Sequence, residues 1–331
     1  MLSLPDERLI EALAGDRRAA VTHAHASFDP RRARERLRAA TMHAVCRHDP
    51  RYPSRMLEAD DAPAVLHVAG DVELLCALAD RDAPAVAIVG ARRAGADGVE
   101  IARSLGRGLA AAGVTVISGM ALGIDAAAHA GALAVGGPTI TVLAGGADVA
   151  YPASKRSLHR ELVRTQAAVS EMPPGFRPFR WCFPARNRTI AGLASMTIVV
   201  EAAERSGSLI TADLAQELGR AVGAVPGPVT VPRCAGTNAL LRDGAFVIRD
   251  AQDALDEALG IGVATALSGR RPEDLSAPLR SLLARVEQGR DTVSSLAPTP
   301  AEAQEAIAGL AELELLGFIR RGPGGHYARL P

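Results

Sequence analysis

Residues 86–119 read VAIVGARRAGADGVEIARSLGRGLAAAGVTVISG, and this stretch indicates the fold class of the whole chain. Its two short apolar runs, at 86–89 and 114–117, predict strands. Between them lies the apolar stripe of a helix that ends at Gly113, formed by Ile101, Leu105, Leu109 and Ala112. A strand, a helix and a second strand in this order are typical of a parallel sheet.

The same alternation continues along the chain. Further apolar runs predict strands at 139–143, 168–170, 197–200, 222–225 and 246–248. Helical patterns fit near 125–135, 154–165, 208–219 and 250–259. Most of the strand runs are apolar throughout, as expected when helices cover both faces of the sheet. We therefore predict an α/β fold with a doubly wound, mostly parallel sheet.

The parts outside this sheet differ in composition. Residues 1–40 are rich in Arg and Ala, with RRARERLR at 31–38, and predict a solvated helix, with disorder or a nucleic-acid-binding arm as alternatives. We place the sheet domain at 41–259, where prolines interrupt the apolar runs of its first part, up to residue 85. Residues 260–275 carry glycine, proline and charges and are expected to be a linker to a separate module at 276–331.

The C-terminal module has its own helical pattern. One apolar stripe comprises Leu279, Leu282, Leu283 and Val286, and residues 292–297 predict a short second helix. A capping box at 299–302 opens a third helix, whose buried face is expected to comprise Ile307, Leu310, Leu313 and Leu316. A hairpin over 318–330 would complete a small winged-helix domain. Its third helix is acidic, which favours protein contact over duplex DNA.

Composition limits the possible ligands. The 37 basic and 37 acidic residues give no net charge at pH 7, so any affinity for nucleic acid must come from a local patch. The four cysteines are widely spaced, which argues against a zinc module or a disulfide framework. We therefore expect no metal, and we expect no cofactor. We also expect no membrane association and a cytoplasmic location, since the sequence contains neither a signal peptide nor a membrane-spanning apolar stretch.

A cationic aromatic run lies at 176–188, FRPFRWCFPARNR. It contains four aromatic residues and four arginines without one acid, and this combination suits single-stranded nucleic acid. Arginines neutralise phosphates, while aromatic faces stack on unpaired bases. The alternative is a core-facing loop whose rings fill the interior and whose arginines pair with acids elsewhere in the chain.

Parallel strands bring the segments that follow them to one rim of the sheet. The segments that we expect there are rich in glycine and basic residues, and they begin at Gly90, Ser118, Gly145 and Ser206. Such loops approach phosphates closely, and a helix start such as Ser208 adds free N–H groups. The G-x-G-x-x-G spacing of dinucleotide sites is missing. We interpret Ser206, Ser208 and Asp125 as helix caps and not as catalytic groups.

Six motifs occur in a specific order: VAIVGARR at 86–93, SGMALGIDAAAH at 118–129, YPASKR at 151–156, FPARNRTIAGL at 183–193, VVEAAERSGSLITA at 199–212 and AVPGPV at 224–229. Together they resemble the DNA-processing protein A family, called DprA or Smf, over about residues 41–250. The resemblance implies an extended Rossmann-like domain that binds single-stranded DNA, forms a homodimer and helps to load the RecA recombinase in natural transformation.

The resemblance also implies a binding site. Its basic pocket would use Arg92, Lys155 or Arg156, and Arg180, with Phe183 stacking on a base. Arg186 and Arg188 would contact phosphate or support the pocket, and Asn187 would bond a base edge or a loop. The phosphate-binding turns add Gly90, Gly119, Ser206, Gly207 and Ser208.

Three positions depart from the family pattern. Ala91 stands where serine is usual, Leu122 where arginine is common and Thr237 where cysteine often occurs. Loss of the charge at position 122 is expected to weaken DNA binding.

Two other functions stay open beside a non-enzymatic DNA-binding protein. One is an enzyme like the nucleoside monophosphate phosphoribohydrolases, although their P-G-G-x-G-T-x-x-E motif is missing here. The other is a protein-interaction adaptor with weak DNA affinity, which the zero net charge and Leu122 would favour.

Overall fold

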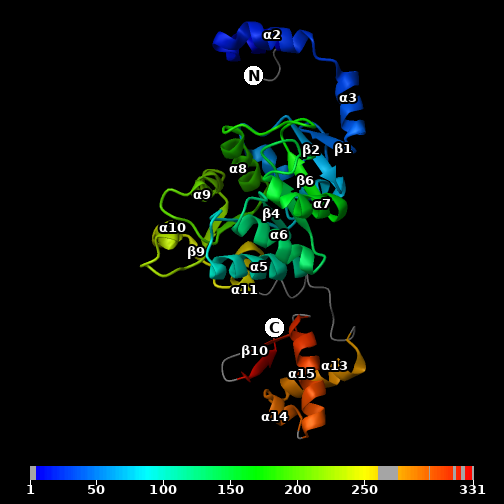
Figure 1. Ribbon diagram of the computed structural model, residues 1–331, viewed down its shortest axis with the longest axis vertical. Coiled ribbons are helices and arrows are strands. Elements are labelled where there is room, and N and C mark those ends of the chain that lie inside the picture. The colour runs from blue at the N-terminus through cyan, green and yellow to red at the C-terminus, as the bar shows by residue number, and fades with distance from the viewer. Residues whose placement is uncertain (1–4, 260–274, 298, 316–317, 322–324, 330–331) are drawn as a thin grey trace.

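The computed structural model describes residues 5–259, 275–297, 299–315, 318–321 and 325–329. Its main feature is a sheet of nine strands within these residues, in the order β1-β2-β6-β5-β4-β3-β7-β8-β9 (Figure 1). The strands are β1 (Met42–Cys46), β2 (Val65–Gly70), β3 (Ala85–Val89), β4 (Thr115–Ser118), β5 (Thr139–Val142), β6 (Ala167–Ser170), β7 (Met196–Val199), β8 (Ala221–Ala224) and β9 (Phe246–Val247). The run from β6 to β9 is parallel, which confirms the predicted α/β fold.

Strands β1 and β2 form an antiparallel edge that the sequence did not predict. They pair with each other, and β2 also pairs with β6 in the antiparallel direction. The prolines in this region led us to expect only short apolar runs. These prolines lie between and after the two strands, so they do not interrupt the ladders.

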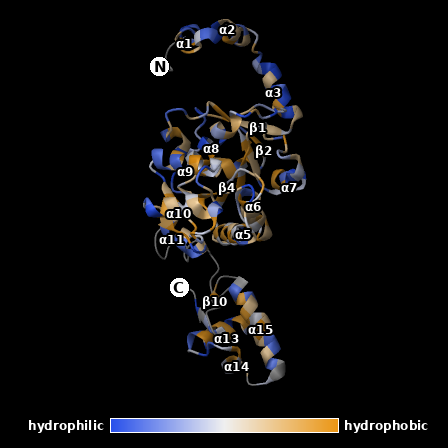
Figure 2. Ribbon diagram, turned by 60° about the vertical axis from the view of Figure 1, so that its left-hand side comes forward, coloured by the Kyte–Doolittle hydropathy of each residue, from blue (hydrophilic) through white to orange (hydrophobic). Residues whose placement is uncertain are grey.

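Helices cover both faces of the sheet. In β3, Val86 and Ile88 belong to one buried cluster and Ala85, Ala87 and Val89 to the other, as the alternation of strand side chains requires. The first face carries α5 (Ala96–Ala111), α6 (Ile124–Ala134), α7 (Arg156–Thr165) and α11 (Ala251–Leu259). The second carries α4 (Val72–Cys76), α8 (Cys182–Leu193), α9 (Gly207–Glu217) and α10 (Ala235–Arg242). Figure 2 shows the apolar residues concentrated on the strands between these layers.

Helix α8 lies where we expected a loop. The second half of the cationic aromatic run, from Cys182 onward, is helical. Its buried face comprises Arg186, Thr189, Ile190 and Leu193, which follow the spacing of a helix stripe. An arginine and a threonine occupy the first two positions, so hydrophobic periodicity did not reveal the helix.

The sheet reverses its winding beside β3. The chain proceeds from β3 through β4 and β5 to β6 on one side, then crosses to β7 on the other side of β3. Doubly wound sheets bind ligands at such a switch point, outside the carboxyl ends of the strands.

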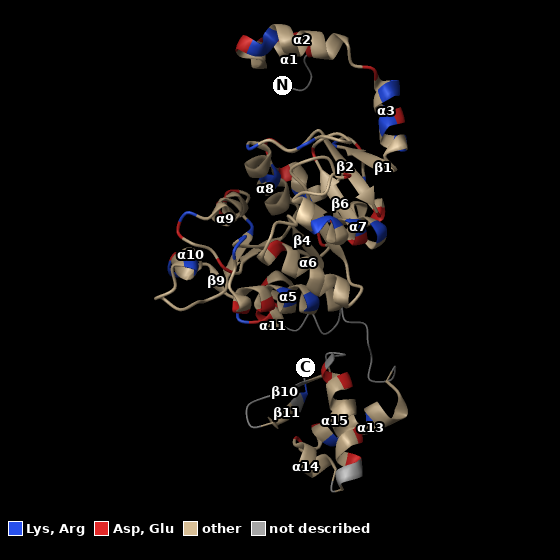
Figure 3. Cartoon of the chain, in the orientation of Figure 1, with Lys and Arg blue, Asp and Glu red and all other residues tan. Residues whose placement is uncertain are grey.

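The N-terminal segment is helical. It contains α1 (Asp6–Leu13), α2 (Arg18–Ala26) and α3 (Pro30–Ala39), and none of these helices has a buried residue. Helix α3 contacts β1, and its arginines are blue in Figure 3.

The C-terminal module contains α13 (Ala277–Glu287), α14 (Val293–Leu296), α15 (Pro300–Leu315) and the antiparallel strands β10 (Ile319–Arg321) and β11 (Tyr327–Arg329). Thr299 and Glu302 form the predicted capping box. Ile307 is exposed, contrary to our prediction, because the buried stripe of α15 includes Ala306, Leu310 and Leu313. Leu316 and most of the expected linker lie outside the described residues. The winged-helix arrangement and the domain boundaries stay predictions.

Among the described residues, no helix is both long and apolar enough to cross a membrane.

Candidate nucleic-acid interface

A pocket of about 300 Å³ lies at the switch point of the sheet. We call it the switch-point pocket. Four segments that are distant in sequence line it: the turn after β3, the turn after β4, the first half of α8 and the start of α9. Eight of the residues predicted for the site line this one pocket, namely Gly90, Arg92, Phe183, Arg186, Asn187, Ser206, Gly207 and Ser208.

Arg92 and Phe183 lie at the mouth of the pocket, and Tyr151 packs on Phe183 from outside the lining. The guanidinium carbon of Arg92 lies 5.5 Å from the centre of the Phe183 ring, which is a cation–π distance. The Tyr151 ring centre lies 5.5 Å from that of Phe183, with the two planes at 52°. Arg92 is exposed, and no carboxylate in the described part of the chain pairs with it. The mouth therefore presents an unneutralised cation beside two aromatic rings.

The floor of the pocket is an ion pair between Asp125 and Arg186. Both side chains are buried, and a carboxylate oxygen of Asp125 lies 3.7 Å from an Nη atom of Arg186. Burial raises the pKa of Asp125, although Arg186 and the backbone N–H of Ala121 act in the opposite direction. Burial lowers the pKa of Arg186, whereas the charge of Asp125 acts to raise it. Arg186 thus supports the pocket from below.

Two sequence interpretations change at the floor. Asp125 is not the cap of α6, because Gly123 occupies the N-cap position and Asp125 binds Arg186 instead. Gly119 makes room for the pair, since a Cβ atom there would lie 1.4 Å from Nη1 of Arg186. It lies behind Arg186 and does not line the pocket.

The start of α9 closes one side of the pocket. Ser206 caps the helix as predicted, because its Oγ accepts a hydrogen bond from the N–H of Ser208. The side-chain amide of Asn187 donates to the carbonyl of Gly207 at 3.3 Å, which ties α8 to this helix start. The positive end of the helix dipole therefore faces the pocket.

Glu201 anchors the turn that carries Arg92. Its carbonyl accepts a hydrogen bond from the N–H of Ala91 at 2.7 Å, and its buried carboxylate accepts one from the N–H of Gly95 at 3.1 Å. The carboxylate also lies 3.3 Å from Arg233. Neither Glu201 nor Tyr151 was among our predicted site residues. Glu201 lies two positions after β7, and Tyr151 begins the YPASKR motif in the loop after β5, so their place at the same rim was the signal available in the sequence.

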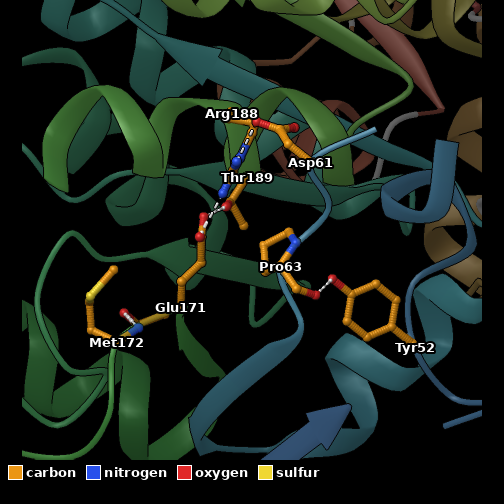
Figure 4. A network of polar contacts seen from close by, with 8 residues as sticks. Tyr52, Asp61, Pro63, Glu171, Met172, Arg188 and Thr189 are labelled. Carbon is orange, nitrogen blue, oxygen red and sulfur yellow. Dashed lines mark hydrogen bonds and ion pairs between the residues drawn. The ribbon is translucent and has the colours of Figure 1, made fainter. Parts of the chain in front are cut away.

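Arg188 lies in a different network, near the antiparallel edge of the sheet. Its guanidinium pairs with Asp61 and, at 2.7 Å, with Glu171, which also accepts a hydrogen bond from Thr189 (Figure 4). Burial opposes the charge of Arg188, but the bonds to both carboxylates outweigh it and raise its pKa. For this arginine the structure matches the alternative interpretation, in which acids elsewhere in the chain hold the arginines.

The remaining predicted residues lie outside the lining of the pocket. Lys155 precedes α7, Arg156 begins it, and Arg180 is exposed in the turn before α8. Phe179 and Trp181, on either side of Arg180, are also exposed, at 60% and 58%. No described carboxylate pairs with Lys155, Arg156 or Arg180.

Comparisons with known proteins show the family of this chain. Residues 43–259 match the model of the family described as DNA recombination-mediator protein A. The protein Smf of Synechocystis sp. is 34% identical over 311 residues, which cover 84% of this chain and 78% of that protein.

Two solved structures are also similar. That of DNA processing protein A from Streptococcus pneumoniae has a TM-score of 0.69 at 34% identity, covering 77% of this chain and 87% of that one. That from Helicobacter pylori, described for its single-stranded DNA binding mode, has a TM-score of 0.58 at 29% identity, covering 66% and 95%. By the match over 43–259, this chain belongs to the DNA recombination-mediator protein A family.

Proposed function

We propose that this chain binds single-stranded DNA in the switch-point pocket. The observation that carries the proposal is the pairing of Arg92 with Phe183 at the mouth, where a cation without a carboxylate partner lies 5.5 Å from an aromatic ring. Arg92 would neutralise a backbone phosphate, and Phe183 or Tyr151 would stack on an unpaired base. The start of α9 would bind a second phosphate through its free N–H groups.

The size of the pocket favours a single strand. A volume of about 300 Å³ suits one nucleotide unit and lies at the small end of ligand pockets. Bases in a duplex are stacked and paired, so they cannot offer their faces to Phe183. We expect little sequence preference, because every base has a face for stacking.

The family supports the wider role. We infer that the chain is a non-catalytic mediator of recombination in the cytoplasm, which acts as a homodimer, protects incoming DNA in natural transformation and loads the RecA recombinase onto it. The inferred site comprises the residues of the pocket together with Lys155, Arg156 and Arg180, with Gly119 behind Arg186. Arg188 is left out, because Asp61 and Glu171 hold its guanidinium. The state of Asp125 supports a non-catalytic role, since the one carboxylate among the described lining residues is already paired with Arg186.

The test compares binding of single-stranded and double-stranded oligonucleotides to the wild-type protein and to Arg92→Ala, by fluorescence anisotropy. We expect the wild type to prefer the single strand. Arg92→Ala should lose about 5-fold in affinity at about 0.1 M salt, the share of one phosphate contact. Arg107→Ala is the control, because Arg107 is an exposed arginine of α5 outside the pocket lining. Equal affinity for duplex, or an unchanged Arg92→Ala, would contradict the proposal.

A further inference from the structure

A second concavity, of about 780 Å³, lies between the antiparallel edge of the sheet and α7. We call it the α7 groove. Its lining comes from the start of β1, the end of β2, helix α7 and the loops after β5 and β6. The residues that matter for its chemistry are His43, Asp148, Arg156, His159, Arg160 and Arg177.

The groove is positively charged. Arg156, Arg160 and Arg177 are exposed, and none of them pairs with a carboxylate among the residues that the structure describes. Asp148 is the one acid of the described lining, and both of its oxygens accept the N–H of Gly175, at 3.0 and 2.9 Å. Asp148 therefore holds a loop in place and leaves the three guanidinium groups facing solvent.

The arginines of the groove are arranged along a line. Arg156 and Arg160 are four positions apart on α7, which places them on one face of the helix about 6 Å apart along its axis. Figure 3 shows basic residues on this helix. Arg177 reaches the groove from the loop after β6. Such a row suits a chain of repeated negative charges better than a single anion.

Two loops connect residues of the groove with residues at the mouth of the switch-point pocket. One loop carries Tyr151, which contacts Phe183 at the mouth, and then Arg156, which lines the groove. The other carries Arg177 in the groove and leads through Arg180 to Phe183 at the mouth. Each loop therefore joins the mouth of the switch-point pocket to the lining of the α7 groove.

We propose that the α7 groove binds the backbone of the same single strand after it leaves the switch-point pocket. This inference rests on the proposed function and extends it to a longer site, in which Arg160 and Arg177 contact phosphates outside the pocket. Phe176 and Phe179 lie on the second of these loops, and their rings pack edge to face with centres 5.8 Å apart. They offer a surface on which a base could stack between the pocket and the groove.

The geometry favours a single strand over a duplex in the groove as well. A strand whose base stacks on Phe183 is unpaired there, so the groove beside the pocket receives a single strand and not a duplex.

The test measures affinity for oligothymidylates of two lengths, about 6 and about 20 nucleotides, which lie near the two ends of known single-strand site sizes. The variant is Arg160→Ala/Arg177→Ala in the full chain. We expect its affinity for the long strand to fall about 25-fold at about 0.1 M salt, and the slope of log affinity against log salt to decrease by about 1.4. Affinity for the short strand should stay within about twofold of wild type, because the pocket alone holds it.

The matched control is Arg17→Ala/Arg107→Ala, which removes two exposed arginines without described carboxylate partners elsewhere on the chain. It should bind both lengths like the wild type, and circular dichroism melting should show all variants folded. If the groove variant binds the long strand like the wild type, or loses both lengths equally, the groove inference is wrong while the pocket stands. If the wild type binds neither strand, the proposed function fails as well.

Discussion

The mouth and the floor of the switch-point pocket each contain an arginine, yet the two arginines have opposite roles. At the mouth, Arg92 is exposed and its neighbour is the ring of Phe183. At the floor, Arg186 is buried and its neighbour is the carboxylate of Asp125. The charge of Arg92 is available to a ligand, whereas that of Arg186 is already neutralised. The difference shows that the partner of an arginine, and not its place in a motif, decides what the arginine can bind.

Arg188 extends this contrast, because it follows Arg186 by two positions and yet belongs to another network. Two carboxylates hold it, one of them 127 positions earlier in the chain. Three predictions test how far this contrast between the arginines holds.

The largest effect is expected from Arg186→Met, which removes the cation of the floor. Asp125 then stays buried without a partner, and losing one member of a buried pair costs about 4 kcal/mol of unfolding free energy. Urea unfolding at neutral pH measures this loss.

The double variant Arg186→Met/Asp125→Asn is the control for that experiment. It removes both charges together, so it should recover at least part of the stability. If Arg186→Met lowers the unfolding free energy by less than about 1 kcal/mol, the stability of the fold does not depend on the pair of Arg186 and Asp125.

A second effect concerns acid stability and His129, which is buried on α6 one turn after Asp125. Thr139 Oγ1 donates its proton to the carbonyl of Val116, so Nδ1 of His129 must donate to Thr139, at 2.8 Å. Nε2 has no partner among the described residues. Burial lowers the pKa of His129 from 6.5 to about 4.

The sign of the pH effect follows from that lowered pKa. Between pH 6.5 and about 4 the unfolded chain binds a proton at His129 that the folded chain does not, so stability falls as the pH falls through this window. The loss attributable to His129 should total about 3 kcal/mol. His129→Asn retains a donor toward Thr139 but cannot be protonated. Unfolding in urea at several pH values should therefore show a shallower loss in the variant, and parallel profiles would contradict the prediction.

The smallest of the three effects is expected from Arg188→Met. Its network is partly open to solvent, so the unfolding free energy should fall by about 2 kcal/mol, less than for the floor. The affinity of the folded protein for single-stranded DNA should stay within about twofold of wild type, because Arg188 does not line the pocket. Unfolding and anisotropy measurements on the same preparation separate the two quantities. A tenfold loss of affinity without a loss of stability would place Arg188 in the DNA site instead.

Much of the sheet could be predicted from the sequence. The parallel strands are local apolar runs between helical stripes, and the glycine-rich turns that follow them meet at one rim for topological reasons. Because these turns meet at one rim, most of the predicted site residues line one pocket. Helix α8 and the edge strands β1 and β2 were missed, because an arginine on a buried stripe and prolines between strands hide the local pattern.

The parallel strands between helical patterns and the cationic aromatic run can be read from the sequence, since each depends on residues that are neighbours along the chain. Which arginines stay free depends on how distant segments pack together. Arg92 contacts the ring of Phe183, Arg186 pairs with Asp125, and Arg188 pairs with Asp61 and Glu171. These partners lie between 17 and 127 positions away in sequence. The physical reason is that the availability of a charge depends on burial and on the nearest opposite charge, and both are set when distant segments pack together.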